Sequence, residues 1–242
     1  MTGNELERKV KNILRKYTWG VTSSPYYTDP ITQKAREKDI VATDIRLSYD
    51  DVFSYYARLF IECKIFPKTT EIYEYTDQVE IENTILHFNI PFANFSEIER
   101  DKNTHANKYN KIFEPKDSED FLYPAINQNL QSFNAFRKSN NEKGIYFLIV
   151  VYSGELFCVD QNGDKKKCSN ALVKINALDN TFGLPNRECF VELISINKFE
   201  NVFGEIRDDI KKIDSSITFY YRMENNRNRE KTERMKKYND AR

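Results

Sequence analysis

The sequence has few glycines and prolines, and it lacks any apolar run long enough to cross a bilayer. Its 242 residues include 7 glycines and 7 prolines, which excludes collagen-like and low-complexity proteins. Because no membrane-spanning stretch is present, we expect no membrane association. The charged N-terminal stretch MTGNELERKVKNILRKY lacks the apolar segment of a signal peptide, so we expect a cytoplasmic protein.

Paired cysteine motifs and an excess of either charge are also absent. The four cysteines include no C-x-x-C pair, and the two histidines have no zinc-like spacing, so the pattern predicts reduced structural thiols and no zinc site. Basic and acidic residues number 37 each, which provides no general attraction to nucleic acid or to anionic membranes.

The hydrophobic and aromatic content of the sequence indicates a folded globular protein. Hydrophobic residues make up 40% of the chain and aromatic residues 14%. Periodicity and turn residues predict helices over 2–17, 118–143 and 200–213, and strands over 37–49, 52–66, 145–153 and 188–199. The stretch 154–167 adds a strand that ends in an N-G turn. This order predicts an α/β fold with a mixed central β-sheet flanked by helices on both faces.

The composition changes along the chain suggest three parts. We assign residues 1–67 and 118–215 to one core, 68–117 to an insertion, and 216–242 to a charged helical tail. Acidic residues predominate in the insertion and basic residues in the tail. Contact between the tail and phosphate groups is one interpretation, and the favoured one is a solvated helix.

The stretch LFIECKIF, residues 59–66, carries two charges inside an apolar run. Side chains two positions apart on a strand share a face, so Glu62 and Lys64 project together. If this strand pairs with the strand before it, Asp39, which stands at the start of that strand's apolar run, comes close to Glu62. Two carboxylates with a backbone carbonyl and waters would form an oxygen-rich site suited to Mg²⁺ or Mn²⁺.

An acid followed after a gap by E-x-K at the end of an apolar strand resembles the signature of the PD-(D/E)XK nucleases, the restriction-endonuclease-like superfamily. The matching residues are EKD, ending at Asp39, and ECK at 62–64. Lys38 stands where that signature has proline. The resemblance implies a restriction-endonuclease-like core with an insertion. It also implies a Mg²⁺-dependent endonuclease that cleaves nucleic acid, DNA in preference to RNA, in restriction, defence or repair.

The resemblance assigns roles to individual residues. Asp39, Glu62 and the backbone carbonyl of Cys63 would bind the metal, and Lys64 would orient the attacking water. Members of the family add a glutamate on the first helix, for which we prefer Glu7 to Glu5. Some carry a glutamine on the helix after E-x-K, for which we prefer Gln128 to Gln131. Many act as dimers, so a homodimer is also implied.

Each of these assignments has a simpler alternative. Glu62 and Lys64 would then form an ion pair on a strand with one solvent-exposed face, and Asp39 would cap a turn. Glu37 is a second candidate for the acidic position. For the whole chain, the alternative is a catalytically silent member of the same fold that binds nucleic acid or a protein partner.

Overall fold

The structure is a computed structural model that describes residues 1–29, 32–47, 54–67, 69–73, 86–88, 106–108, 122–140, 142–160, 162–175 and 189–240. The helices are α1 (Gly3–Lys16), α2 (Leu122–Ser139) and α3 (Phe199–Asp240). The strands are β1 (Gly20–Ser23), β2 (Tyr26–Thr28), β3 (Ala35–Glu37), β4 (Ile40–Leu47), β5 (Ser54–Ile65), β6 (Thr70–Tyr73), β7 (Leu86–Phe88), β8 (Ala106–Lys108), β9 (Gly144–Ser153), β10 (Leu156–Val159), β11 (Lys165–Cys168), β12 (Asn170–Ile175) and β13 (Cys189–Ser195).

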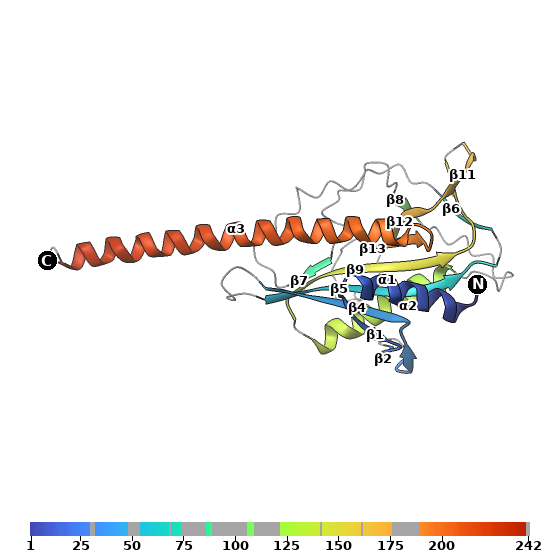
Figure 1. Ribbon diagram of the computed structural model, residues 1–242, viewed down its shortest axis with the longest axis horizontal. Helices are drawn as coiled ribbons and strands as arrows, with labels where there is room; N and C mark the ends of the chain where they lie inside the picture. The colour runs from blue at the N-terminus through green and yellow to red at the C-terminus, as the bar shows by residue number, and fades with distance from the viewer. Residues whose placement is uncertain are drawn as a thin grey trace.

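A mixed sheet forms the centre of the molecule, as the sequence predicts (Figure 1). Its strand order is β1-β4-β5-β9-β13-β12-β8, with β7 paired to one end of β9. Strands β1, β4 and β5 are antiparallel neighbours, whereas β5, β9 and β13 run parallel to one another. The parallel strand β9 is buried along nearly its whole length, which explains its continuous apolar sequence. Apart from the short strands β6, β7 and β8, the predicted insertion 68–117 lies outside the described residues.

The predicted first helix is confirmed, and its start follows from its sequence. Thr2 caps α1 by accepting from the backbone N–H of Glu5, while the Glu5 side chain accepts from the backbone N–H of Thr2. Leu6, Val10 and Leu14 fall on the buried face of α1. This apolar stripe fixes α1 against one face of the sheet.

Strand β5 divides the core into two layers because its side chains alternate. Ile61 and Cys63 face a cluster that also contains α1 and the first half of α3. Phe60 faces the other cluster, which contains α2, and its ring packs against Phe133 at a centroid distance of 5.5 Å. Helices therefore cover both faces of the central sheet, and Glu62, two residues after Phe60, belongs to the α2 side.

The predicted helix after the insertion is α2, although the Ser118 cap lies outside the described residues. Pro124 sits in the first turn of α2, where a missing N–H breaks no helical hydrogen bond. The helix ends at Ser139, and β9 begins at Gly144.

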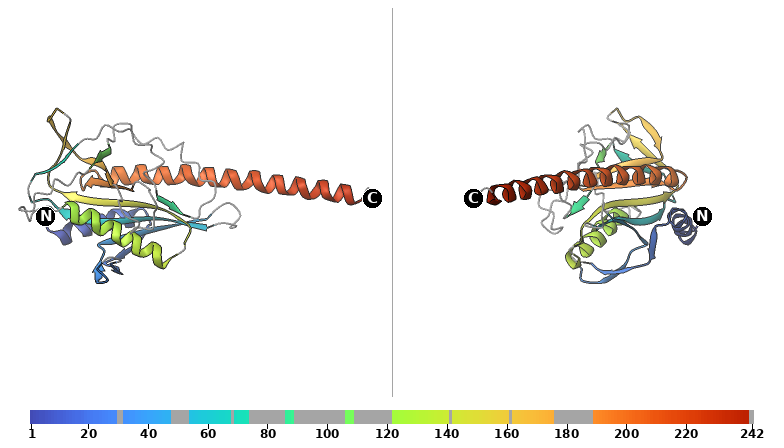
Figure 2. Two further views of the ribbon diagram at one scale, coloured as in Figure 1. Left: turned by 180° about the vertical axis from the view of Figure 1, so that it is seen from behind. Right: turned by 60° about the vertical axis from the view of Figure 1, so that its left-hand side comes forward.

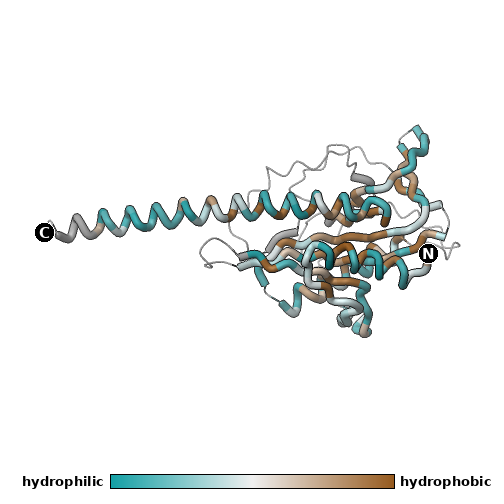
Figure 3. The backbone as a smooth tube through the Cα atoms, viewed as in Figure 1, coloured by the Kyte–Doolittle hydropathy of each residue, from teal (hydrophilic) through white to brown (hydrophobic). Residues whose placement is uncertain are grey.

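Helix α3 is longer than the two separate segments expected. It runs without interruption across the boundary that we placed at 216 and extends well past the sheet (Figure 2). Among its described side chains the last buried one is Ile217, and the stretch 224–234 is hydrophilic (Figure 3). No helix among the described residues is long and apolar enough to cross a membrane.

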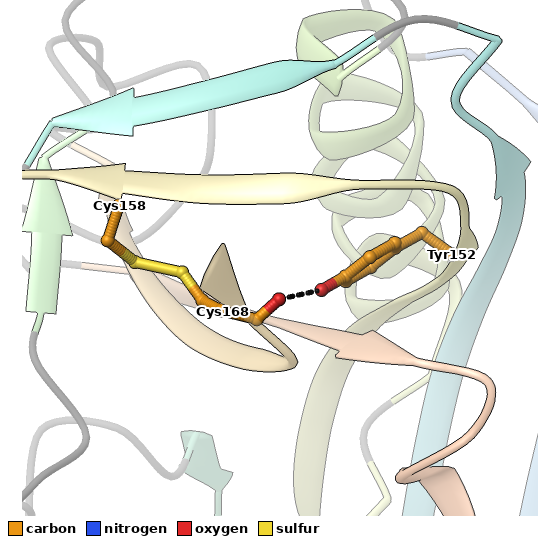
Figure 4. The surroundings of a disulfide bond; sticks show 3 residues. All are labelled: Tyr152, Cys158 and Cys168. Carbon is orange, nitrogen blue, oxygen red and sulfur yellow. Dashed lines mark hydrogen bonds between the residues drawn. A yellow bond between two sulfur atoms is a disulfide. The ribbon is translucent and has the colours of Figure 1, made fainter. Parts of the chain in front are cut away.

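The expectation of four reduced thiols is wrong for two of them. Cys158 on β10 and Cys168 on β11 form a disulfide, and the Cys168 carbonyl accepts from the Tyr152 hydroxyl at 2.8 Å (Figure 4). The antiparallel register pairs Cys158 with Lys166, which places Cys168 diagonally across the hairpin at a Cα–Cα distance of 6.1 Å. The sequence spacing alone does not reveal this register. Because disulfides persist in oxidising compartments, a cytoplasmic location stays a prediction.

We expect Cys158→Ser to lower the free energy of unfolding by about 2 to 3 kcal/mol, because the crosslink that restricts the unfolded chain is lost. Urea titration without reductant measures the difference from wild type. The same titration with dithiothreitol is the control, since reduction should make the free energies of unfolding of the two proteins equal. Equal stability of both proteins without reductant would show that the crosslink does not form.

Candidate functional site

The β4–β5 hairpin brings the two predicted carboxylates together. The register pairs Ile40 with Ile61, so Asp39, immediately before β4, comes opposite Glu62. The Asp39 Oδ2 atom accepts a hydrogen bond of 2.7 Å from the backbone N–H of Cys63. This bond closes the open end of the hairpin and holds the Asp39 carboxylate beside the peptide that follows Glu62.

Glu62 lies between two lysines. Its side chain is fully buried, and its Oε1 atom accepts from Lys38 Nζ at 2.8 Å. Lys64 Nζ lies 3.5 Å from Oε2, and the Lys64 side chain is 29% exposed. Among the described residues, Oε2 has no hydrogen-bond partner. The glutamate therefore has one oxygen bound to a buried cation and a second oxygen beside a cation that reaches solvent.

Burial governs the protonation of this pair. It raises the pKa of Glu62, an effect that Lys38 opposes and the nearby Asp39 carboxylate reinforces. Burial likewise lowers the pKa of Lys38, against the influence of Glu62. The Asp39 carboxylate therefore lies close enough to Glu62 for the two negative charges to repel each other. A further cation between them would relieve that repulsion.

The Cys63 peptide lies at the same edge of β5 as Asp39. A strand residue directs its N–H and its carbonyl toward the same neighbouring strand. Because the Cys63 N–H donates to Asp39, its carbonyl is directed to that side as well. The Cys63 thiol is buried, and burial together with Asp39 and Glu7 raises its pKa well above the ordinary value. The thiol is therefore a packing group rather than a nucleophile.

The structure does not bring Glu7 to the face on which Glu62 lies. Helix α1 packs on the Cys63 face of β5, and Glu7 forms an ion pair of 3.4 Å with Lys11 on the same helix. Helical periodicity identifies the buried side of α1 but does not reveal which sheet face it covers. Glu7 remains near enough to affect the Cys63 thiol.

Gln128 lies on the α2 side, near the start of the Lys38–Asp39 turn. Its Nε2 atom donates to the carbonyl of Glu37 at 2.6 Å. The backbone carbonyl of Gln128 accepts from the Tyr27 hydroxyl at 3.4 Å. Gln128 thus connects α2 to the two short strands that precede the site, a positioning contact rather than a metal contact.

Sequence reasoning missed Lys38 as the partner of Glu62, and it did not place Tyr27 near Glu62. In the sequence, Lys38 stands out only because it replaces the proline of the family signature. The one available sign of its role is that a basic residue directly precedes Asp39. The Tyr27 phenol has its pKa raised to about 12, first by burial and then by the Glu62 and Asp29 carboxylates. It therefore lies within electrostatic reach of Glu62, which its position in a turn-rich stretch does not indicate.

Among the described residues, no three His, Cys, Asp or Glu side chains gather into a ready-made metal site. The predicted site instead depends on two carboxylates and a backbone carbonyl, a set of hard oxygen donors. Comparison of the chain with known protein families, with curated proteins and with solved structures finds no match.

We expect Lys38→Met to lower the free energy of unfolding by about 3 kcal/mol, because it leaves the buried Glu62 charge without its closest partner. The matched control is Lys64→Met, which removes the more exposed lysine and should cost less than about 1 kcal/mol. Urea titration of both variants measures the difference. The double variant Lys38→Met/Glu62→Leu should recover most of the loss. Equal losses in the two single variants would contradict a structural role for the buried pair.

Proposed function

We propose that the chain is a metal-dependent nuclease of the PD-(D/E)XK type, with a restriction-endonuclease-like core, that hydrolyses phosphodiester bonds. The observation that carries the proposal is the register of the β4–β5 hairpin. It sets Asp39 opposite Glu62, and Lys64 follows two residues later on the same face. A strand that served only to fill the core would not bury a carboxylate between two lysines.

The donor set suits Mg²⁺ or Mn²⁺. The buried Glu62 Oε2 atom, which lacks a hydrogen-bond partner among the described residues, offers one oxygen. Asp39 offers a second, and the Cys63 carbonyl is directed to the same edge. When bound, the ion would lower the pKa of a water and stabilise charge on the phosphate.

Side chains near the proposed metal would contact the phosphate, orient the attacking water and hold Glu62 in place. Lys64 reaches solvent beside Glu62, so its ammonium can contact a phosphate oxygen and orient the attacking water. Lys38 holds Glu62 in a single position through its 2.8 Å bond, which preorganises the carboxylate before substrate arrives. Glu7, on the opposite face, would act only through the Cys63 region.

DNA is the substrate that we propose first, because the resemblance is to enzymes that act on DNA. The proposed catalytic groups contact only the phosphate, so the same reaction would also cleave RNA. The hydrophilic end of α3 carries basic residues that would add backbone contacts, among them Arg227, Arg229 and Arg234. We propose that the enzyme is cytoplasmic, that it acts in restriction, defence or repair, and that it acts as a homodimer.

A catalytically silent relative is the second candidate, and one observation favours it. Lys38 already neutralises Glu62, so the carboxylate needs no metal to remain buried. Such a protein would bind nucleic acid or a protein partner through the same surface without cleaving. The absence of cleavage with retained binding identifies this case.

We expect the purified protein to cleave DNA with Mg²⁺ or Mn²⁺ and to stop when EDTA removes the ion. Glu62→Gln should reduce the rate by at least about 100-fold, because the substituted amide is a poorer metal ligand than the carboxylate. Gel electrophoresis of linear, circular and single-stranded DNA, and of RNA, measures the rate.

The control for this experiment is Glu192→Gln. Glu192 is a buried glutamate of the same sheet, on β13, that accepts from Asn170 at 3.3 Å. We expect this variant to cleave at the wild-type rate. Cleavage by Glu62→Gln at the wild-type rate, or no cleavage of any substrate by the wild type, would refute the nuclease proposal.

A further inference from the structure

A pocket of about 580 Å³ lies beside the candidate site, on the α2 side of the sheet. Its walls come from the β2–β3 region, from β4 and β5, and from the C-terminal half of α2. Pockets that bind small ligands typically have volumes of about 300 to 1,000 Å³. The pocket is not part of the Asp39–Glu62 arrangement, and the proposed hydrolysis does not require it.

Two residues connect the pocket to the candidate site. Lys38 lines the pocket, and its Nζ atom is the one that bonds to Glu62 at 2.8 Å. Tyr27 also lines it, and the Glu62 charge contributes to the raised pKa of the Tyr27 phenol. A ligand in this pocket would therefore lie next to a phosphate that contacts Lys64, beside Glu62.

Aromatic residues are four of the seven apolar residues that line the pocket. Tyr26, Tyr27, Phe60 and Phe136 line it, whereas its aliphatic members are small. The Tyr26 side chain is 75% exposed, so its ring is not used in the core of this chain. Exposed aromatic rings beside cationic groups are the usual platform for stacking nucleobases.

The polar groups of the pocket fit the same ligand. Ser132 and Asn140 line it too, and because they donate to the carbonyls of Asn129 and Phe136, their own oxygens are what they offer to the edge of a base. Lys138, which is exposed on α2, supplies positive charge for the adjoining phosphates, whereas the Lys38 charge is paired with Glu62. An aliphatic peptide or a lipid chain would fit a surface with more aliphatic and fewer polar groups.

We infer that this aromatic pocket holds one unstacked nucleobase of the strand whose phosphate contacts Lys64, beside Glu62. The inference rests on the proposed function for the position of the phosphate. It adds that the protein distinguishes a strand that carries bases from a bare sugar–phosphate backbone. Enzymes that work on nucleic acid frequently rotate one nucleotide out of the stack into such a pocket.

Fluorescence anisotropy in EDTA tests the inference without cleavage. The probes are a labelled single-stranded oligonucleotide and an abasic oligonucleotide of the same length. We expect the wild type to bind the first about tenfold more tightly, because stacking one base contributes about 1 to 3 kcal/mol. Equal affinity for both probes, or binding of neither, overturns the inference.

Three variants locate the effect. Tyr26→Ala removes an exposed ring and Ala135→Trp fills the pocket from α2, and each should remove most of the preference for the base-containing probe. Tyr73→Ala removes a 45% exposed tyrosine of β6 outside the pocket and should change nothing. Thermal melting confirms that each variant is folded. Unchanged preference in Tyr26→Ala and Ala135→Trp also overturns the inference.

The two proposals can fail separately. Base-dependent binding without metal-dependent cleavage would refute the nuclease proposal and keep the pocket as a base-binding site. Glu62-dependent cleavage with equal affinity for both probes would refute the pocket and keep the nuclease.

Discussion

The buried ion pair between Lys38 and Glu62 is the interaction on which the rest of the site depends. A carboxylate in the middle of a central strand is unfavourable unless a partner is supplied, and the partner comes from the turn that precedes the neighbouring strand. The pair holds the Lys38–Asp39 turn against β5. It thereby determines where Asp39 can lie, and Asp39 in turn bonds to the Cys63 peptide.

Neighbouring elements support this turn from the α2 side. Gln128 binds the Glu37 carbonyl and so connects α2 to the chain just before Lys38. The pairing of β2 with β3 places Tyr27 near Glu62 and forms one wall of the aromatic pocket. The candidate catalytic groups and the proposed base-binding pocket therefore share one structural support.

The parts of this arrangement that depend on local patterns could be predicted from the sequence. The capped amphipathic helix α1 and the β4–β5 hairpin follow from periodicity, and period-two alternation correctly puts Glu62 and Lys64 on one face. Lys38 as the partner of Glu62 could not be predicted, because the bond bridges two strands and depends on the conformation of a turn. Glu7 faces the Cys63 side for a similar reason, since periodicity does not determine which face of the sheet a helix covers. The disulfide likewise depends on a hairpin register that no spacing rule reveals.

The central claim is that Asp39 and Glu62 share one divalent cation, and the most direct test is a Mn²⁺ titration followed by electron paramagnetic resonance. Wild-type protein should bind Mn²⁺ at one site, and Mg²⁺ should compete for it. Both Asp39→Asn and Glu62→Gln should abolish this binding, since each removes one of the two carboxylates. Mn²⁺ binding that survives in both variants, or wild-type protein that binds none, would contradict the account.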